Sequence, residues 1–291
     1  MIMSSSASYY RPHHIADALN WLSQEGGIIA AGCTDLLPLT TSPELSGKVL
    51  DVTAIKDMRG ITDEGDHRRF GGATTWTDLI RADLPPAYDM LKLAAREIGS
   101  IQIQNTGTIA GNICNASPAA DSVPCLLNLN ASVELTAPKG KRVIPLDQFI
   151  LGPRKTSRQA DEIVTALVVP KTAETGFSSF RKLGARKYLI ISIAMSAVRI
   201  VASEGKITEA AISIGSCSPV AKRLTKAEAA LSGTVITPSL RADQMLSKAD
   251  ITSVISPIDD ARGTADYRME AAAVLVLETV DHCLDQIRAS A

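Results

Sequence analysis

Cysteine pairs that could bind a metal are missing from this sequence of 291 residues. The five cysteines lie far apart, and none forms a C-x-x-C pair: Cys33, Cys114, Cys125, Cys217 and Cys283. An odd and scattered set is typical of free thiols in a reducing compartment rather than of a disulfide framework. The scatter also argues against a structural zinc or an iron–sulfur cluster held by this chain alone. We therefore expect a cytoplasmic protein without a metal site of its own.

Long apolar runs and single-sign charge tracts are also missing. The first residues, MIMSSSASYYRPHH, contain no apolar stretch of the kind found in signal peptides. The most apolar run, residues 188–201, includes Ser192, Ser196 and Arg199 and is too short to cross a bilayer. The net charge is −1, and basic residues occur in pairs rather than in a stripe. The sequence therefore predicts no membrane span and no nucleic-acid partner.

The composition that remains is that of a globular protein, with 45% apolar and 21% charged residues. The length allows about two domains. Helical spacing over residues 15–22, followed by apolar segments at 28–32 and 48–53, predicts a βαβ-like unit over residues 9–55. Alternating segments around polar turns predict hairpins at 60–74, 132–146 and 189–215. Helices are expected at 75–82, 86–99, 123–131 and 267–287, and a strand is expected at 161–170. The character of the sequence shifts near residues 170–176, where we expect a domain boundary.

Two segments combine small side chains with hydrogen-bonding groups: IIAAGCTD (residues 28–35) and TGTIAGNICNASPAAD (residues 106–121). The second passes with a single charge, at Asp121. Glycines let a ligand approach the backbone and let N–H groups converge on an anion. Either segment alone fits an ordinary turn, whereas the two together suggest a ligand with two phosphates held between subdomains. Neither contains the G-x-G-x-x-G fingerprint of Rossmann domains.

Asp121 admits two interpretations from its position. It directly precedes SVPCLLNL, which favours the N-cap of a helix. Its isolation after a long uncharged stretch suits an acceptor for ligand hydroxyls. Residue type alone leaves both open.

Four segments together resemble a known family. AAGCTDLLP, TGTIAGNICNASPAADSVPCLLNLNA, GPRKT and FRKLGARK resemble the FAD-binding (medium) subunit of the molybdenum hydroxylases, a family that includes xanthine dehydrogenase and carbon monoxide dehydrogenase. The resemblance covers nearly the whole chain. It implies an α/β (α+β) fold in which residues 1–172 form a two-subdomain FAD-binding domain of the PCMH/vanillyl-alcohol-oxidase type. The subdomains would span about 1–57 and 58–172, and residues 173–291 would form a carbon monoxide dehydrogenase flavoprotein-like domain with a three-stranded sheet and helices.

The function implied by the resemblance is electron transfer in an oxidoreductase. A large partner subunit hydroxylates the substrate at a molybdenum–pterin centre, and a small partner subunit carries two [2Fe–2S] clusters. FAD in this chain would take their electrons and pass them to an external acceptor such as NAD⁺, O₂ or a quinone. The implied assembly is a dimer of heterotrimers, a heterohexamer. Two alternatives remain: a flavin-free assembly subunit and a stand-alone flavin oxidase.

The resemblance also implies the residues that contact FAD, with no catalytic residue and no metal ligand among them. The phosphate-side loop would comprise Ile29, Ala30, Ala31, Gly32, Cys33, Thr34, Asp35 and Leu36. The second loop would contribute Thr108, Gly111, Asn112 and Cys114, the last of these beside the isoalloxazine. Asp121 would bind ribose or ribityl hydroxyls. Val164 and Lys182 would touch the flavin end, with Arg181 competing for the second position, and Ile98 is a further implied contact.

The chain departs from the family pattern at two small residues. Cys33 replaces the second glycine of the usual A-G-G, and Ala110 replaces the first of two glycines before Asn112. A positive φ at Cys33 would carry some strain. Neither flavin loop contains a histidine, so we expect non-covalent FAD. The cysteine-rich insertion that carries an extra [4Fe–4S] cluster in some relatives is absent, so we expect no such cluster.

Overall fold

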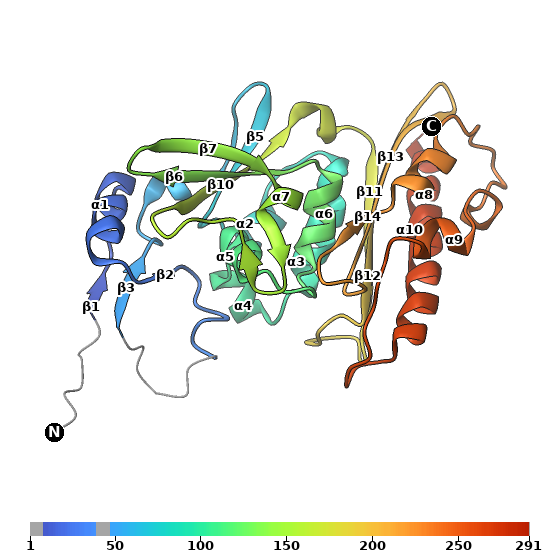
Figure 1. Ribbon diagram of the computed structural model, residues 1–291. Helices are drawn as coiled ribbons and strands as arrows, with labels where there is room; N and C mark the ends of the chain where they lie inside the picture. Colours follow the sequence, from blue (N-terminus) through green and yellow to red (C-terminus); the bar gives the residue numbers. More distant parts are fainter. Residues whose placement is uncertain (1–7, 39–46, 291) are drawn as a thin grey trace.

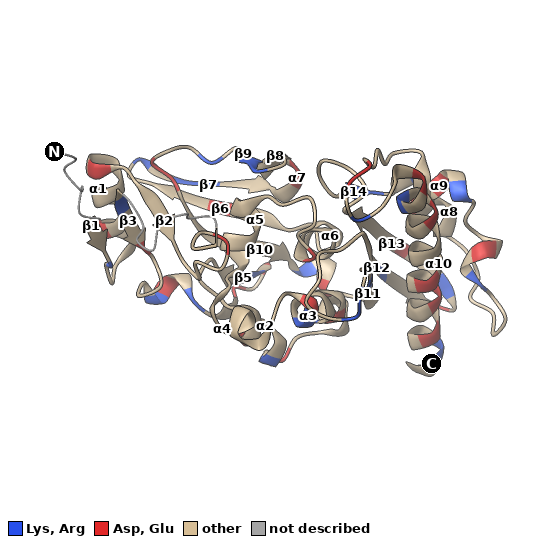
Figure 2. Ribbon diagram, turned by 90° about the horizontal axis from the view of Figure 1, so that it is seen from below, with Lys and Arg blue, Asp and Glu red and all other residues tan. Residues whose placement is uncertain are grey.

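The computed structural model describes residues 8–38 and 47–290. Figure 1 shows three layers of structure in a row: a small sheet with α1, a larger sheet with short helices beside it, and a third sheet covered by α10. Acidic and basic residues are interspersed along the described ribbon in Figure 2. Within the described residues, no helix combines the length and the apolar character needed to cross a membrane.

The first sheet is parallel and has three strands in the order β1 (Ser8–Tyr10), β3 (Lys48–Asp51) and β2 (Ile28–Ala30). Helix α1 (Ile15–Glu25) connects β1 to β2 and buries one apolar face, Ala18, Leu19 and Leu22. The predicted βαβ-like unit is therefore confirmed. Because the sheet is parallel, the loop that follows β2 starts at the carboxyl ends of the strands, where such sheets bind ligands.

The second sheet is antiparallel, with five strands in the order β4-β5-β10-β6-β7. Their bounds are Ile61–Asp63, His67–Gly71, Ile163–Pro170, Ser132–Ala137 and Gly140–Pro145. The pairs β4–β5 and β6–β7 are the hairpins predicted at 60–74 and 132–146. The central strand β10 is buried along most of its length, and its pairing with β6 shifts between Val164 and Ala166.

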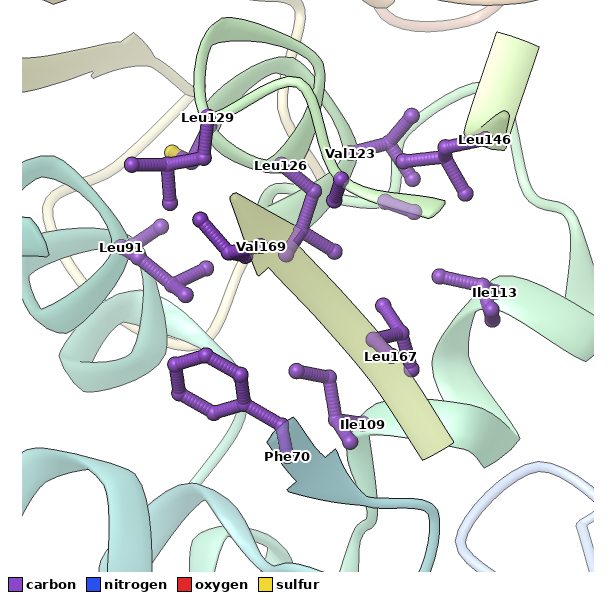
Figure 3. Close-up of a cluster of buried hydrophobic side chains, with 14 of the residues drawn as sticks. Phe70, Leu91, Ile109, Ile113, Val123, Leu126, Leu129, Leu146, Leu167 and Val169 are labelled. Carbon is purple, nitrogen blue, oxygen red and sulfur yellow. The ribbon is translucent and has the colours of Figure 1, made fainter. Parts of the chain in front are cut away.

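Short helices pack on one face of this sheet. They are α2 (Trp76–Arg81), α3 (Asp89–Glu97), α4 (Ile101–Thr106), α5 (Ile109–Asn115), α6 (Ser122–Asn128) and α7 (Leu146–Phe149), with the 3₁₀ turns η1 (Lys56–Met58), η2 (Pro86–Tyr88) and η3 (Lys171–Glu174). Figure 3 shows side chains of α5 and α6 meeting Leu167 and Val169 of β10. After α7 comes a small hairpin, β8 (Ile150–Gly152) and β9 (Lys155–Thr156). Of these elements, α4, α5 and α7 were not predicted as helices.

The third sheet is antiparallel, in the order β11 (Phe177–Leu183), β12 (Ala194–Ser203), β13 (Lys206–Gly215) and β14 (Lys222–Arg223). It has the three long strands that the resemblance implied and adds a fourth of two residues. Strand β12 begins at Ala194, so residues 189–193, which were predicted to belong to the hairpin, lie outside the observed strand. Helix α10 (Ala265–Ser290) covers one face of the sheet, and α3 and α6 pack on the other. The remaining helices are α8 (Thr225–Leu231), α9 (Lys248–Thr252) and the 3₁₀ turn η4 (Ala242–Gln244).

Candidate functional site

A cavity of about 810 Å³ lies where the loop after β2, helix α5 and the segment before β12 meet. This volume is within the range typical of small-molecule sites. Every predicted cofactor contact except Lys182 lines it: Ile29, Ala30, Ala31, Gly32, Cys33, Thr34, Asp35, Leu36, Ile98, Thr108, Gly111, Asn112, Cys114, Asp121 and Val164. The fold thus brings residues from four separate parts of the sequence around one cavity.

The first loop, residues 31–36, crosses closely over the end of α4. A Cβ added at Gly32 would lie 2.0 Å from the carbonyl oxygen of Thr106, so only glycine permits this approach. The next residue, Cys33, has a φ of 56°, in the left-handed region that favours glycine. The positive φ considered from the sequence is therefore present, and some strain is stored in the backbone beside the cavity.

The second loop contains the helix α5, whose first residues are hydrogen-bonded to the segment that follows β5. Thr108 accepts a hydrogen bond from the Gly111 N–H and so caps the helix. The N–H groups of Ile109 and Ala110 donate to the carbonyls of Thr74 and Gly72, at 3.0 and 3.1 Å.

One face of α5 packs in the core, and the other lines the cavity. Ile109 and Ile113 point into the core, four residues apart (Figure 3). Gly111, Asn112 and Cys114 line the cavity. The small side chains therefore serve two purposes, close packing of backbones on one side and access for a ligand on the other.

Asp121 is buried, and both of its carboxylate oxygens have partners. Ser192 Oγ donates to Oδ1 at 2.5 Å, and Lys182 Nζ donates to Oδ2 at 2.8 Å. Asp121 occupies the N-cap position of α6, as its place in the sequence favoured, but its side chain makes no cap hydrogen bond to the helix. Burial raises the pKa of Asp121, although the Lys182 ammonium and the Ser192 hydroxyl both oppose the rise. Since a carboxylate offers about four acceptor positions, capacity for further donors remains.

Lys182 and Arg181 point to opposite faces of β11, as neighbours in a strand do. Lys182 joins Asp121, whereas Arg181 pairs with Glu278 of α10 at 3.5 Å. Lys182 lines a separate cavity of about 710 Å³ against α10 and lies behind Asp121 as seen from the main cavity. Of the two competing residues, only Lys182 is therefore connected to the main cavity.

Several lining residues were missed by the sequence interpretation. Asn115 donates from Nδ2 to Asp35 Oδ1 at 2.8 Å and accepts a hydrogen bond from Arg154 Nη1. Arg158 and Ser192 also face the cavity. Arg154 lies within GPRKT, a family-like segment to which no role was given, whereas no local pattern marks Ser192.

The two cysteines at the cavity are neutral thiols. Burial raises the pKa of Cys114 to about 11, and it also raises the pKa of Cys33. A protonated thiol is a poor nucleophile and a poor metal ligand. Within the described residues, no group of three His, Cys, Asp or Glu side chains gathers to bind a metal. The cysteines therefore act here as small apolar side chains.

The residues present fit a flavin dinucleotide. Apolar side chains at Ile98, Ile103 and Val164 could contact a planar ring, and Asp121 could accept hydroxyl donors. Arg154 and Arg158 place positive charge along the same cavity. The close approach at Gly32 holds the first loop against Thr106 beside the cavity.

Comparison with known proteins gives a consistent family assignment. The family model for the FAD binding domain in molybdopterin dehydrogenase matches residues 4–172. The model for the CO dehydrogenase flavoprotein C-terminal domain matches residues 178–282.

Two relatives match over nearly their full length. The nicotine 6-hydroxylase medium subunit of Paenarthrobacter nicotinovorans is 30% identical, with 94% of this chain and 95% of the relative covered. The xanthine dehydrogenase FAD-binding subunit of Escherichia coli O157:H7 is 28% identical, with 97% of each covered. A solved structure of carbon monoxide dehydrogenase from Hydrogenophaga pseudoflava superposes with a TM-score of 0.86 at 29% identity, covering 97% of this chain and 98% of that one. The chain therefore belongs to the family of FAD-binding medium subunits of the molybdenum hydroxylases and is an oxidoreductase subunit.

Proposed function

We propose that this chain binds FAD non-covalently in the 810 Å³ cavity and transfers electrons within a molybdenum-containing hydroxylase. Electrons would arrive from [2Fe–2S] clusters in a small partner subunit and leave to an external acceptor. A large partner subunit would hold the molybdenum–pterin centre. The assembly would be a dimer of heterotrimers, with this chain as the medium subunit. Within it, residues 1–172 would act as the FAD-binding domain and 173–291 as the C-terminal domain.

The observation that carries this proposal is the convergence of both small-residue loops on one cavity. The first loop supplies Gly32, Thr34 and Asp35, and the second supplies Gly111 and Asn112. No acid–base pair or activated nucleophile is required of the chain, because bound FAD supplies the redox chemistry by accepting and releasing electrons. The chain's own task is to bind and orient.

Each part of the cavity wall has a distinct role in this proposal. Residues 29–36 would hold the phosphates through backbone N–H groups and Thr34. Thr108, Gly111 and Asn112 would line the opposite side, while Ile98, Cys114 and Val164 would pack against the ring. Asp121 would accept hydroxyl hydrogen bonds, and Lys182 would position its carboxylate from behind.

The first experiment is a flavin assay on the purified chain. We expect a flavin absorption spectrum and one FAD per chain, with all colour released to the supernatant by acid precipitation. Colour that stays with the pellet would contradict non-covalent binding. A correctly folded chain with no affinity for FAD would instead favour the flavin-free assembly subunit.

The second experiment concerns partners. Co-expression with the two other subunits should yield a complex that contains iron and molybdenum. Its substrate turnover should require all three chains. Full turnover of an organic substrate by this chain alone would favour the stand-alone flavin oxidase and would refute the proposed electron transfer.

A further inference from the structure

Two arginines that line the main cavity form no ion pair with a carboxylate of the described residues. Arg154 and Arg158 lie on and just after the β8–β9 hairpin, which is marked by basic residues in Figure 2. Neither guanidinium forms an ion pair with a carboxylate of residues 8–38 or 47–290. Nearby Glu162 pairs with Arg142 at 2.5 Å instead. Arg142 lowers the pKa of Glu162 with help from Arg158, but Arg158 makes no direct contact with that carboxylate. Both guanidinium groups can therefore meet an anion in the cavity.

The backbone at Arg154 favours a smaller residue than the one found there. Arg154 follows Pro153 in the two-residue connection of the hairpin and has a φ of 59°. This is the turn position at which glycine or asparagine is favoured after proline. The Arg154 N–H donates to the carbonyl of Ala116 at 2.9 Å, which fixes the turn against the end of α5. A long cationic side chain on a strained backbone points to a use for that side chain.

The Arg154 side chain is held beside the first loop by a chain of hydrogen bonds. Its Nη1 donates to Asn115 Oδ1, and Asn115 Nδ2 donates to Asp35 Oδ1 at 2.8 Å. A guanidinium has five donors, and one of them is used in this contact. The others can reach a ligand that lies along residues 31–36.

Arg158 is oriented by backbone carbonyl groups. Its Nη1 donates to the carbonyls of Gln159 and Glu162 at 3.0 and 2.8 Å, which orients the side chain. Its positive charge opposes the rise that burial causes in the pKa of Cys114. Arg158 therefore lies close to Cys114, and the two arginines approach the cavity from one hairpin.

We propose that Arg154 and Arg158 bind the pyrophosphate of a dinucleotide in this cavity through their guanidinium groups. Guanidinium groups match phosphate oxygens with paired N–H donors, and two of them can balance the two charges of a pyrophosphate. The inference rests on the proposed function, in which FAD supplies that pyrophosphate. A dinucleotide acceptor such as NAD⁺ carries the same group, so the experiment separates the two sources.

The test compares FAD with riboflavin, which has no phosphate, on the full-length apoprotein. Arg154→Gln and Arg158→Gln should each weaken FAD binding by about 10- to 150-fold, as expected for a lost charge-assisted hydrogen bond. Riboflavin binding should not change. Lys155→Gln is the matched control, because it removes a positive charge from the same hairpin but does not line the cavity. It should bind FAD as the wild-type chain does.

A further variant separates ligand binding from folding. Arg154→Gly removes the side chain and suits the positive φ, so it should melt no lower than the wild-type chain while still losing FAD affinity. Equal weakening of FAD and riboflavin by the arginine variants would show a structural role and would overturn the proposal.

A second measurement tests binding of the electron acceptor NAD⁺ and uses the assembled complex. If the variants bind FAD normally but raise the KM for NAD⁺ with little change in kcat, the two arginines bind the pyrophosphate of the acceptor rather than that of FAD. If FAD affinity and the KM for NAD⁺ both stay at wild-type values, the proposal is overturned while the proposed function stands. A wild-type chain with no affinity for any flavin overturns the proposed function and this assignment together.

Discussion

The two loops that bound the cavity are held in place in different ways. The second loop is fastened by backbone hydrogen bonds to Thr74 and Gly72, and its helix α5 places Ile109 and Ile113 in the core. The first loop, residues 31–36, is irregular and is positioned by contacts with the second, at Gly32 and at the Asp35–Asn115 hydrogen bond.

This difference separates folding from binding. Substitutions in the second segment should lower the free energy of unfolding even without ligand, because its groups are buried and paired. Substitutions in the first loop should mainly lower ligand affinity, because that loop can shift without opening the core. The predictions that follow test this contrast.

The largest effect is expected at Asp121. Asp121→Ala leaves the buried Lys182 ammonium without its carboxylate and should lower the free energy of unfolding of the apoprotein by about 3–5 kcal/mol. Urea denaturation measures this. Asp35→Ala in the first loop is the comparison; Asp35 is exposed, so its loss should lower the free energy of unfolding by only about 1 kcal/mol. Similar losses at both sites would contradict the contrast between the loops.

Gly32→Ala tests the first loop. The added Cβ would lie 2.0 Å from the Thr106 carbonyl oxygen, so the loop must move. We expect FAD affinity to fall by about tenfold or more, in line with a penalty of about 1–3 kcal/mol for overpacking. Apoprotein stability should change little. FAD titration provides the measurement, with Gly152→Ala as control because a Cβ there meets open space. Normal FAD affinity in Gly32→Ala would refute the close approach.

Lys182→Met makes stability depend on pH. Without the ammonium, the Ser192 hydroxyl remains to oppose the effect of burial, so the pKa of Asp121 rises further above the unfolded value of about 3.9. The folded state then binds more protons than the unfolded state, so the free energy of unfolding should fall as pH rises above about 4. The slope can reach about 1.4 kcal/mol per pH unit. Denaturation at several pH values measures it, and a profile parallel to that of the wild-type chain would contradict the role of the ion pair.

The smallest effect is expected at Cys33. Cys33→Gly relieves a positive φ of 56° and should raise the free energy of unfolding by about 1 kcal/mol. Cys33→Ala removes the same thiol without relieving the backbone, so it should give no such gain. The melting temperatures of the two variants measure this difference. Equal melting temperatures would show that the thiol, and not the backbone, sets the effect.

Much of the fold could be predicted from local patterns. Alternating strands around the polar turn at residues 63–66 predicted β4–β5, and helical spacing predicted a helix at 75–82, where α2 lies. Helix α5 was missed because its glycine and asparagine residues favour a loop. Burial of Ile109 and Ile113 in the core stabilises the helix in spite of them. Strand β12 was predicted to start too early, since apolar residues 189–193 form part of the wall beside the cavity instead.

The sequence by itself determined which residues are small enough for a ligand to approach, because a missing Cβ is a local property. The glycines and alanines of residues 29–36 and 106–121 carry that information, and so does the family resemblance built on them. Only the tertiary structure decided how the polar side chains pair. Asp121 meets Lys182 and Ser192, and Asp35 meets Asn115, across 61, 71 and 80 residues of sequence. Such contacts depend on how sheets and helices pack, and no local pattern specifies that packing.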